Sequence, residues 1–236
     1  MRLDRIDSTQ DEARRRLNET GDAILVVAAT QMMGRGRQGR EWAQPDRGMY
    51  ASYCFLSDWA MRDRTLIPLV AAVAMRDAVC ESFGVALGLR WPNDLMVDGD
   101  KVGGILVETS RDVVVVGCGV NLWWEKPMDG AASLLAGDPG SDPPPALAET
   151  WTERLITHLD RGRDQWPRAE YESASVTLGR DVFWDTGHGR ATAIGRDGEL
   201  IVDRDGELTC LRAGEVHTRD SLTRRARRAT RGRTDG

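Results

Sequence analysis

The sequence predicts an α+β protein in which a mixed sheet is flanked by helices and followed by a small β-barrel. Apolar strands and one long apolar helix fill the first half of the chain, which is typical of a sheet with helical cover. Near the C-terminus the strands shorten and Asp-Gly turns separate them, which favours a barrel. The length of 236 residues suits one medium domain with an appendage. We expect a large domain over 1–176, a barrel over 177–222 and a disordered Arg-rich tail over 223–236.

A helix is predicted close to the N-terminus. Ser8 and Thr9 provide an N-cap, and Glu12 stands where the acidic residue of a capping box belongs. The helix should run to about Asn18, because Gly21 then ends it.

Two apolar strands are predicted next, at Ala23–Thr30 and Met49–Leu56. The first ends in a loop rich in glycine and arginine, and ligands commonly bind at the ends of strands in α/β sheets. Leu66–Phe83 is then predicted to be a helix with an apolar face, since Pro68 lies near its start and Gly84 follows its end.

A β-meander is predicted in the middle of the chain, with strands at Leu95–Asp98, Lys101–Thr109 and Val113–Leu122. The turn between the first two contains Gly99 and directs Lys101 back toward the sheet. Residues 125–145 are rich in proline and glycine and should form a loop or lid, and Ala146–Trp166 is predicted to be helical. The barrel strands are expected at Val182–Thr186, Arg190–Ile194, Glu199–Val202 and Glu207–Leu211.

The composition excludes several classes of protein. The 4 cysteines are scattered without a C-x-x-C pair and there are 3 histidines, so neither a zinc site nor a disulfide framework is expected. A net charge of −5 gives no overall attraction to nucleic acid or anionic lipid. The longest apolar run, Leu66–Met75, is too short to span a bilayer. We therefore expect a reduced, cytoplasmic enzyme without membrane attachment.

The loop from Gly34 to Trp42 is the strongest local signal of function. It contains three glycines and three arginines in the seven residues from Gly34 to Arg40. Glycines let successive backbone N–H groups turn toward an anion, and guanidinium groups add charge-assisted hydrogen bonds. This combination predicts a phosphate-binding loop.

Lys101 is unusual because the sequence almost never uses lysine. The 32 basic residues comprise 30 arginines and the two lysines Lys101 and Lys126. An ammonium is a compact point charge, and Lys101 is followed by Gly103-Gly104, where backbone can approach a ligand closely. We therefore interpret Lys101 as chemically required and Lys126 as a surface residue.

Five motifs occur in a fixed order along the chain. They are Asp7-Ser8-Thr9, Gln31-x-x-Gly34-Arg35-Gly36-Arg37-x-Gly39-Arg40-x-Trp42, Trp91-Pro92-Asn93-Asp94-Leu95, Lys101-x-Gly103-Gly104-Ile105-Leu106-x-Glu108 and Gly117-x-Gly119-x-Asn121. Together they resemble the catalytic module of biotin-protein ligases from residue 7 to about residue 216. The resemblance implies a fold similar to that of class II aminoacyl-tRNA synthetases, with an SH3-like C-terminal barrel.

The resemblance also implies a reaction in two steps. Biotin and ATP would form biotinyl-5'-AMP, and a lysine of a biotin carboxyl carrier domain would then accept the biotinyl group. The biotin carboxylate must approach ATP, which is a tetra-anion, so cationic donors and Mg²⁺ are needed to cancel the repulsion. A lid must keep water away from the mixed anhydride, biotinyl-5'-AMP. ATP and biotin would be substrates, and the carrier domain of a biotin-dependent carboxylase would be the partner.

Site residues follow from the same resemblance. Lys101 would bridge the carboxylate and the α-phosphate, Arg37 would clamp phosphate, and Asp94 would orient Mg²⁺ or accept a proton from the incoming amine. Biotin would be bound by Ser8, Thr9, Gln31, Gly34, Arg35, Gly104 and Gly119. The adenylate would be bound by Arg35, Gly36, Arg37, Gly39, Arg40, Trp42, Asn93, Lys101 and Asn121.

Two departures from the family pattern stand out. Gln10 occupies a position that is usually Asn, and Arg90 replaces a common Lys before the Trp-Pro-Asn-Asp motif. Because the motifs begin at residue 7, we expect no DNA-binding domain before them. We also expect a monomer or weak homodimer.

Two other interpretations remain open at this point. A lipoate-protein ligase would share the fold and the adenylation chemistry, although its characteristic Arg-Arg-x-Ser-Gly-Gly-Gly loop does not occur in this sequence. A nucleic-acid-binding module would use the barrel and the tail, but the acidic net charge disfavours it.

Overall fold

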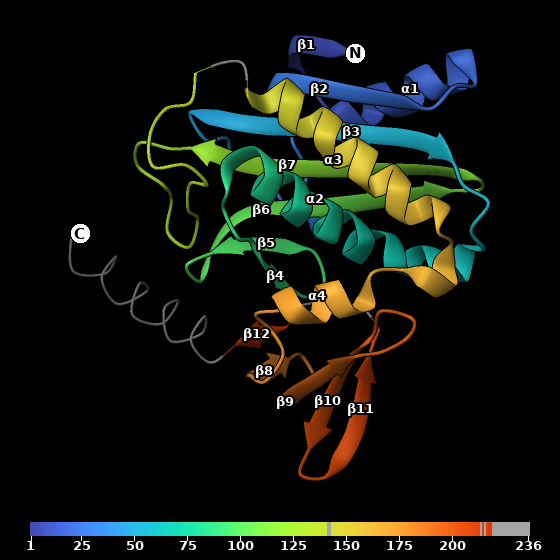
Figure 1. Ribbon diagram of the computed structural model, residues 1–236, viewed down its shortest axis with the longest axis vertical. Helices are drawn as coiled ribbons and strands as arrows, with labels where there is room; N and C mark the ends of the chain where they lie inside the picture. The colour runs from blue at the N-terminus through green and yellow to red at the C-terminus, as the bar shows by residue number, and fades with distance from the viewer. Residues whose placement is uncertain (141–142, 213, 215, 219–236) are drawn as a thin grey trace.

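The computed structural model describes residues 1–140, 143–212, 214 and 216–218. Its centre is a seven-stranded mixed sheet in the order β1-β2-β3-β7-β6-β5-β4 (Figure 1). β1 pairs with β2 in parallel, and the remaining neighbours are antiparallel. The strands are β1 (Arg2–Ile6), β2 (Ile24–Gln31), β3 (Arg47–Leu56), β4 (Gly88–Arg90), β5 (Asp94–Val97), β6 (Asp100–Ser110) and β7 (Val113–Trp123).

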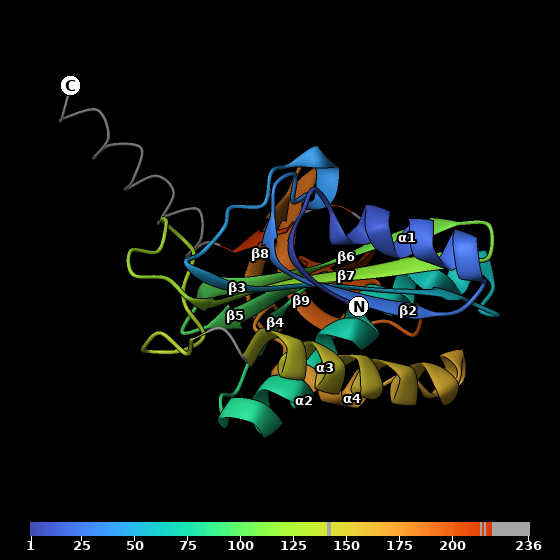
Figure 2. The same cartoon turned by 90° about the horizontal axis from the view of Figure 1, so that it is seen from above.

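Helices cover both faces of this sheet. α2 (Ile67–Phe83) and α3 (Pro143–Asp160) lie on one face, and α1 (Thr9–Thr20) lies on the other (Figure 2). The main core fills the space under α2 and α3, while a small second core joins α1 to the sheet through Ala13, Leu17 and Val26. α1 is short, so part of its face of the sheet stays free for a site.

The first helix is capped differently from the prediction. The Ser8 hydroxyl accepts a hydrogen bond from the backbone N–H of Asp11 at 3.3 Å, so Ser8 is the N-cap. The Glu12 carboxylate pairs with Arg15 and Arg16 one turn later instead of closing a capping box.

The third helix also differs from the predicted span. α3 ends at Asp160, and Gly162, with a φ of +79°, separates it from the 3-10 turn η3 (Arg163–Gln165). Two elements were not predicted: α4 (Arg168–Ala174), which follows this turn, and β1 at the opposite end of the chain. Both are short elements, so neither carries a clear period of hydrophobic residues. The 3-10 turn η2 (Met61–Leu66) precedes α2.

A second sheet of five antiparallel strands lies below the first (Figure 1). Its order is β11-β10-β9-β8-β12, and over the described residues β11 pairs with β10 alone. The described residues therefore form an open sheet rather than the closed barrel that we expected. The strands are β8 (Asp181–Trp184), β9 (Gly187–Ile194), β10 (Leu200–Arg204), β11 (Glu207–Leu211) and β12 (His217–Thr218). The predicted tail at 223–236 lies outside the described residues.

Two tryptophans attach the second sheet to the first domain. The indole N–H of Trp91 donates to the Gly198 carbonyl at 2.9 Å, and that of Trp166 donates to the Arg196 carbonyl at 3.0 Å. Both acceptors belong to the turn between β9 and β10, so this turn holds the small sheet in place. Across the described parts of the chain, no helix is both long and apolar enough to cross a membrane.

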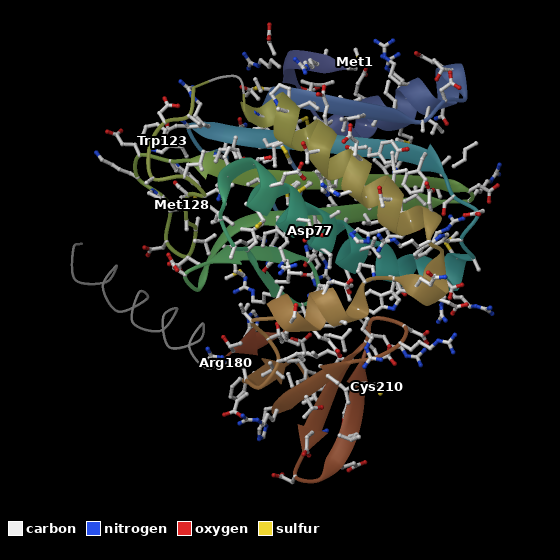
Figure 3. The ribbon with its side chains drawn as sticks, in the orientation of Figure 1. Met1, Asp77, Trp123, Met128, Arg180 and Cys210 are labelled. Carbon is white, nitrogen blue, oxygen red and sulfur yellow. The ribbon has the colours of Figure 1, made fainter. Side chains whose placement is uncertain are left out.

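His158 on α3 makes stability depend on pH. Burial lowers the pKa of His158 below its usual 6.5 and the charge of Arg161 lowers it further, while Asp77 and Glu170 oppose them. Asp77 lies on α2 (Figure 3). The folded state therefore prefers the neutral ring, whereas the unfolded chain binds a proton near its usual pKa. The free energy of unfolding should fall as pH drops from about 7.5 to about 5.5. Urea unfolding of the His158→Gln variant should show a weaker fall over this range, and an equally steep fall would contradict the assignment.

Candidate active site

A cavity of about 470 Å³ opens on the face of the sheet that α1 leaves free. Its floor is made of glycines: Gly104 on β6 pairs in register with Gly119 on β7, and Gly119 pairs with Tyr50 on β3. Gly117 lies on the same face of β7. Because these positions carry no side chains, the sheet surface is hollow where a ligand can lie against backbone.

A β-bulge brings Lys101 onto this face. The register between β5 and β6 shifts, since Leu95 is opposite Gly103 while Met96 is opposite Lys101, which leaves Val102 as the extra residue. In a regular strand Lys101 and Gly104 would point to opposite faces. With the bulge, the Lys101 ammonium lies 3.4 Å from the position that a Gly104 Cβ would take.

The Trp91-Pro92-Asn93-Asp94 motif forms the turn between β4 and β5. Trp91 is buried and anchors the turn, and the bond to Pro92 is cis. Asn93 Nδ2 donates to the Ile105 carbonyl at 2.8 Å, and its backbone carbonyl accepts from the Ile105 N–H at 2.9 Å. The turn is thereby fastened to β6, so that Asn93 and Asp94 face the cavity.

Asp94 pairs with two cations at once. Its Oδ1 lies 2.5 Å from Lys101 Nζ, and its Oδ2 lies 2.5 Å from the terminal nitrogen of Arg90. Burial on its own would raise the pKa of Asp94, but the Lys101 and Arg90 charges outweigh it and hold this pKa below its usual value. The carboxylate is therefore ionised at neutral pH and fixes the Lys101 ammonium.

The Gly/Arg loop forms the opposite wall. The Gly36 N–H donates to the Arg40 carbonyl at 2.7 Å, and Gly39 has a φ of +71°, which favours glycine. Arg37 turns inward: its guanidinium donates to Asn93 Oδ1 at 3.0 Å and to the Gly214 carbonyl at 3.1 Å. The Arg37 guanidinium thus joins the Gly/Arg loop to the β4–β5 turn and to Gly214, which lies between β11 and β12.

Trp42 lies over the glycine floor. A Cβ at Gly119 would lie 3.0 Å from two ring carbons of Trp42, and Lys101 Nζ is 5.4 Å from its ring centroid. The Trp42 Nε1 and the Tyr50 hydroxyl, both on the cavity wall, are buried without a hydrogen-bond partner among the described residues. Buried donors without a partner in the protein are typical of sites where a ligand or a water molecule accepts the hydrogen bond.

A polar corner lies at the start of α1. The backbone N–H and hydroxyl of Thr9 donate to Gln31 Oε1 at 2.8 and 2.9 Å, and the hydroxyl lies 2.8 Å from Ser52 Oγ. Ser8 lines the cavity beside them and caps the helix. Gln10 is also on the wall, where its Nε2 donates to the Leu106 carbonyl at 3.1 Å.

Most of the predicted site residues line this cavity: Ser8, Thr9, Gln31, Arg35, Gly36, Arg37, Arg40, Trp42, Asn93, Asp94, Lys101, Gly104 and Gly119. Arg35 lies at the rim and binds Asp11 at 2.7 Å. Gly34, Gly39 and Asn121 are not on the wall, and Asn121 Nδ2 donates to the Ala132 carbonyl at 3.3 Å instead. The binding and catalytic roles assigned to all of the site residues, on the wall or off it, stay predictions.

Two cavity residues on β3, Ser52 and Tyr50, were not among the predicted site residues. Both are buried and line the cavity. The available signal was Tyr50 and Ser52, two positions apart and therefore on the same face of a largely apolar strand.

The residues present do not fit a metal ion held by the protein alone. Over the described ranges, no group of three or more His, Cys, Asp or Glu side chains could bind one. Both oxygens of Asp94 face cations, so a magnesium ion would have to displace Lys101 or Arg90. The assignment of Mg²⁺ to Asp94 finds no support in this geometry.

The fold and the cavity define an α+β protein with a cavity between an arginine-rich loop and a lysine–aspartate pair. Comparison with known proteins identifies its family. The model of the biotin/lipoate A/B protein ligase family matches residues 3–121, and the chain belongs to that family.

Relatives of known name support the same family. Over an alignment of 213 residues this chain is 31% identical to the biotin–[acetyl-CoA-carboxylase] ligase of Mycobacterium tuberculosis, with 83% of this chain and 79% of that one covered. The ligase of the same name from Paracoccus denitrificans is 36% identical over an alignment of 149 residues, with 60% of each chain covered. The similarity therefore spans less than two thirds of the Paracoccus protein.

Solved structures share the fold over almost the whole chain. The biotin protein ligase of Aquifex aeolicus, solved in complex with biotin and ATP, has a TM-score of 0.75 at 25% identity, with 93% of this chain and 97% of that one covered. The Leishmania major enzyme in complex with biotinyl-5-AMP has a TM-score of 0.64 at 26% identity, with 92% and 96% covered.

Proposed function

We propose that this protein is an ATP-dependent biotin-protein ligase. In the first step a biotin carboxylate oxygen attacks the α-phosphorus of ATP, a P–O bond forms, and pyrophosphate leaves. In the second step a lysine amine of a biotin carboxyl carrier domain attacks the acyl carbon of biotinyl-5'-AMP, so that an amide forms, the amine loses a proton and AMP leaves. The observation that carries the proposal is the Lys101 ammonium on the cavity floor, opposite the loop that directs Arg37 inward.

The residues divide the cavity between the two substrates. The Thr9–Gln31–Ser52 corner offers donors and acceptors to the polar fused-ring urea of biotin, and the glycine floor accommodates its apolar tail. Arg37, Arg40 and the loop backbone would bind phosphate. Lys101 would hold the carboxylate and the α-phosphate together and stabilise the charge that develops between them.

The polar corner favours biotin over lipoate. The dithiolane ring of lipoate carries no urea, so it would leave the Thr9, Gln31 and Ser52 groups without ligand partners. A site whose polar groups hydrogen-bond a substrate rejects an analogue that lacks the matching groups.

Three finer assignments belong to the same proposal. Magnesium would arrive bound to the ATP phosphates, because Mg²⁺ commonly takes few protein ligands. The second sheet would be the family's SH3-like module, since Gly214 and Val216 near its end reach Arg37 and the cavity wall. A cytoplasmic location agrees with the 4 cysteines, which are all free.

Exchange between labelled pyrophosphate and ATP tests the first step without a carrier domain. We expect exchange that requires biotin and is weak with lipoate in its place. Equal exchange with lipoate would favour the lipoate ligase, and no exchange with either acid would contradict the proposal.

The Thr9→Val variant tests the polar corner. Valine keeps the shape of threonine but removes the hydroxyl that meets Gln31 and Ser52. We expect the Kd for biotin to rise about 10- to 100-fold, because a buried group is left unpaired. Isothermal titration measures it, with Thr157→Val as a control, since the Thr157 hydroxyl bonds the Glu153 carbonyl of its own exposed helix face. An unchanged Kd would remove Thr9 from the site.

A further inference from the structure

Arg90 directs its guanidinium at Asp94, its register partner across the β4–β5 turn. Its Nε and one terminal nitrogen lie 3.0 and 2.5 Å from Oδ2, while Oδ1 is left to Lys101. Both partners are largely shielded, with 26% of the Arg90 and 17% of the Asp94 side chain exposed. One carboxylate therefore serves two cations, one through each oxygen.

This arrangement fixes where the Lys101 ammonium can be. Lysine has four rotatable bonds, so its charge is poorly placed unless a partner holds it. Asp94 could be such a partner only if its carboxyl group is itself prevented from turning, and the two Arg90 hydrogen bonds to Oδ2 do this. The result is an ammonium held next to Gly104 on the floor.

Arg90 also compensates charge during the reaction. When a ligand carboxylate and a phosphate reach Lys101, the ammonium must share its charge between them and Asp94. An uncompensated Asp94 would repel both anions at close range, and shielding from water makes this repulsion strong. Arg90 remains bound to Oδ2 and offsets that charge.

Resting on the proposed adenylation, we infer that Arg90 is a positioning residue: it orients Asp94 to hold Lys101 and neutralises Asp94 when Lys101 engages the substrates. Arg90 does not need to touch either substrate for this role. Its loss should therefore lower kcat while the KM for biotin, set by the Thr9 corner, changes little.

The test compares Arg90→Gln and Arg90→Lys by biotin-dependent ATP–pyrophosphate exchange, with thermal melting to confirm folding. Glutamine should lower kcat about 10- to 100-fold, since a charge-assisted hydrogen bond is lost in the transition state. Lysine should recover most of kcat, because it restores the charge on Oδ2. Arg154→Gln is the matched control, since Arg154 pairs with Glu81 in an exposed ion pair outside the cavity wall.

A double-mutant cycle with Asp94→Asn isolates the coupling. If Arg90 acts through Asp94, Arg90→Gln should cost little more in an Asp94→Asn background. A loss as large as in the wild-type background, or a wild-type kcat in Arg90→Gln, would overturn this role while the wild-type enzyme remains active. A wild-type protein without biotin-dependent exchange would instead overturn the proposed function, and the Arg90 role with it.

Discussion

Replacing Lys101 with methionine is expected to lower adenylate formation about 100- to 1,000-fold, because the charge that joins carboxylate and phosphate is removed. Methionine keeps much of the apolar stem, and Lys101 is partly exposed, so the protein should still melt cooperatively. Biotin-dependent exchange measures the loss. Lys126→Met is the natural control because Lys126, the other lysine, is exposed.

The activity and the melting of Lys101→Met together distinguish a loss of catalysis from a loss of folding. If Lys101→Met exchanges pyrophosphate at the wild-type rate, the ammonium has no part in the reaction and the proposed mechanism is wrong. If it is inactive and unfolded, the weaker change Lys101→Arg decides, since Arg keeps the charge but places it in a wider planar group. We expect that variant to fold and to remain slow.

Substituting Gly119 with valine is expected to raise the Kd values for biotin and ATP about 10- to 100-fold. A Cβ at this position would already lie 3.0 Å from the Trp42 ring, so the two further methyl groups must displace the ring and fill the floor. Isothermal titration of each ligand measures the effect. Wild-type affinity in a folded Gly119→Val protein would show that ligands do not use this floor.

Gly137 supplies the control for that substitution. A Cβ at Gly137 would meet no atom within 4 Å, and its φ is not in the left-handed region. Gly137→Ala should therefore bind both ligands as the wild-type protein does, which separates a steric effect at the floor from a general effect of removing glycine.

Local sequence signals predicted the central elements well. α2 and β7 are apolar over most of their length, and Gly84 follows the end of α2, so short-range patterns suffice for them. The composition of the Gly/Arg loop and the rarity of lysine likewise indicated an anion-binding site that includes Lys101. Residues of the loop and Lys101 do line the same cavity. Arginine and lysine side chains are ordinarily cationic at neutral pH, so their presence in the sequence is enough to suggest an anion-binding site.

Long-range geometry could not be predicted in this way. The bulge at Val102 decides which face Lys101 occupies, and it depends on pairing with β5 rather than on the residues of β6. The contact between Arg37 and the Gly214 carbonyl joins positions that are far apart in the chain. The partnership of Ser52 with Thr9 likewise exists only once β3 and α1 have packed together.

The most direct test is to incubate the protein with biotin, MgATP and a biotin carboxyl carrier domain, and to measure the intact mass of the acceptor. We predict that the acceptor gains a single biotinyl group, that this addition requires ATP, and that it is lost in Lys101→Met. With lipoate in place of biotin, we predict that the acceptor gains no lipoyl group. An acceptor of unchanged mass, while the protein still forms the adenylate, would contradict the transfer step. An equal lipoyl addition would contradict the choice of biotin as the substrate.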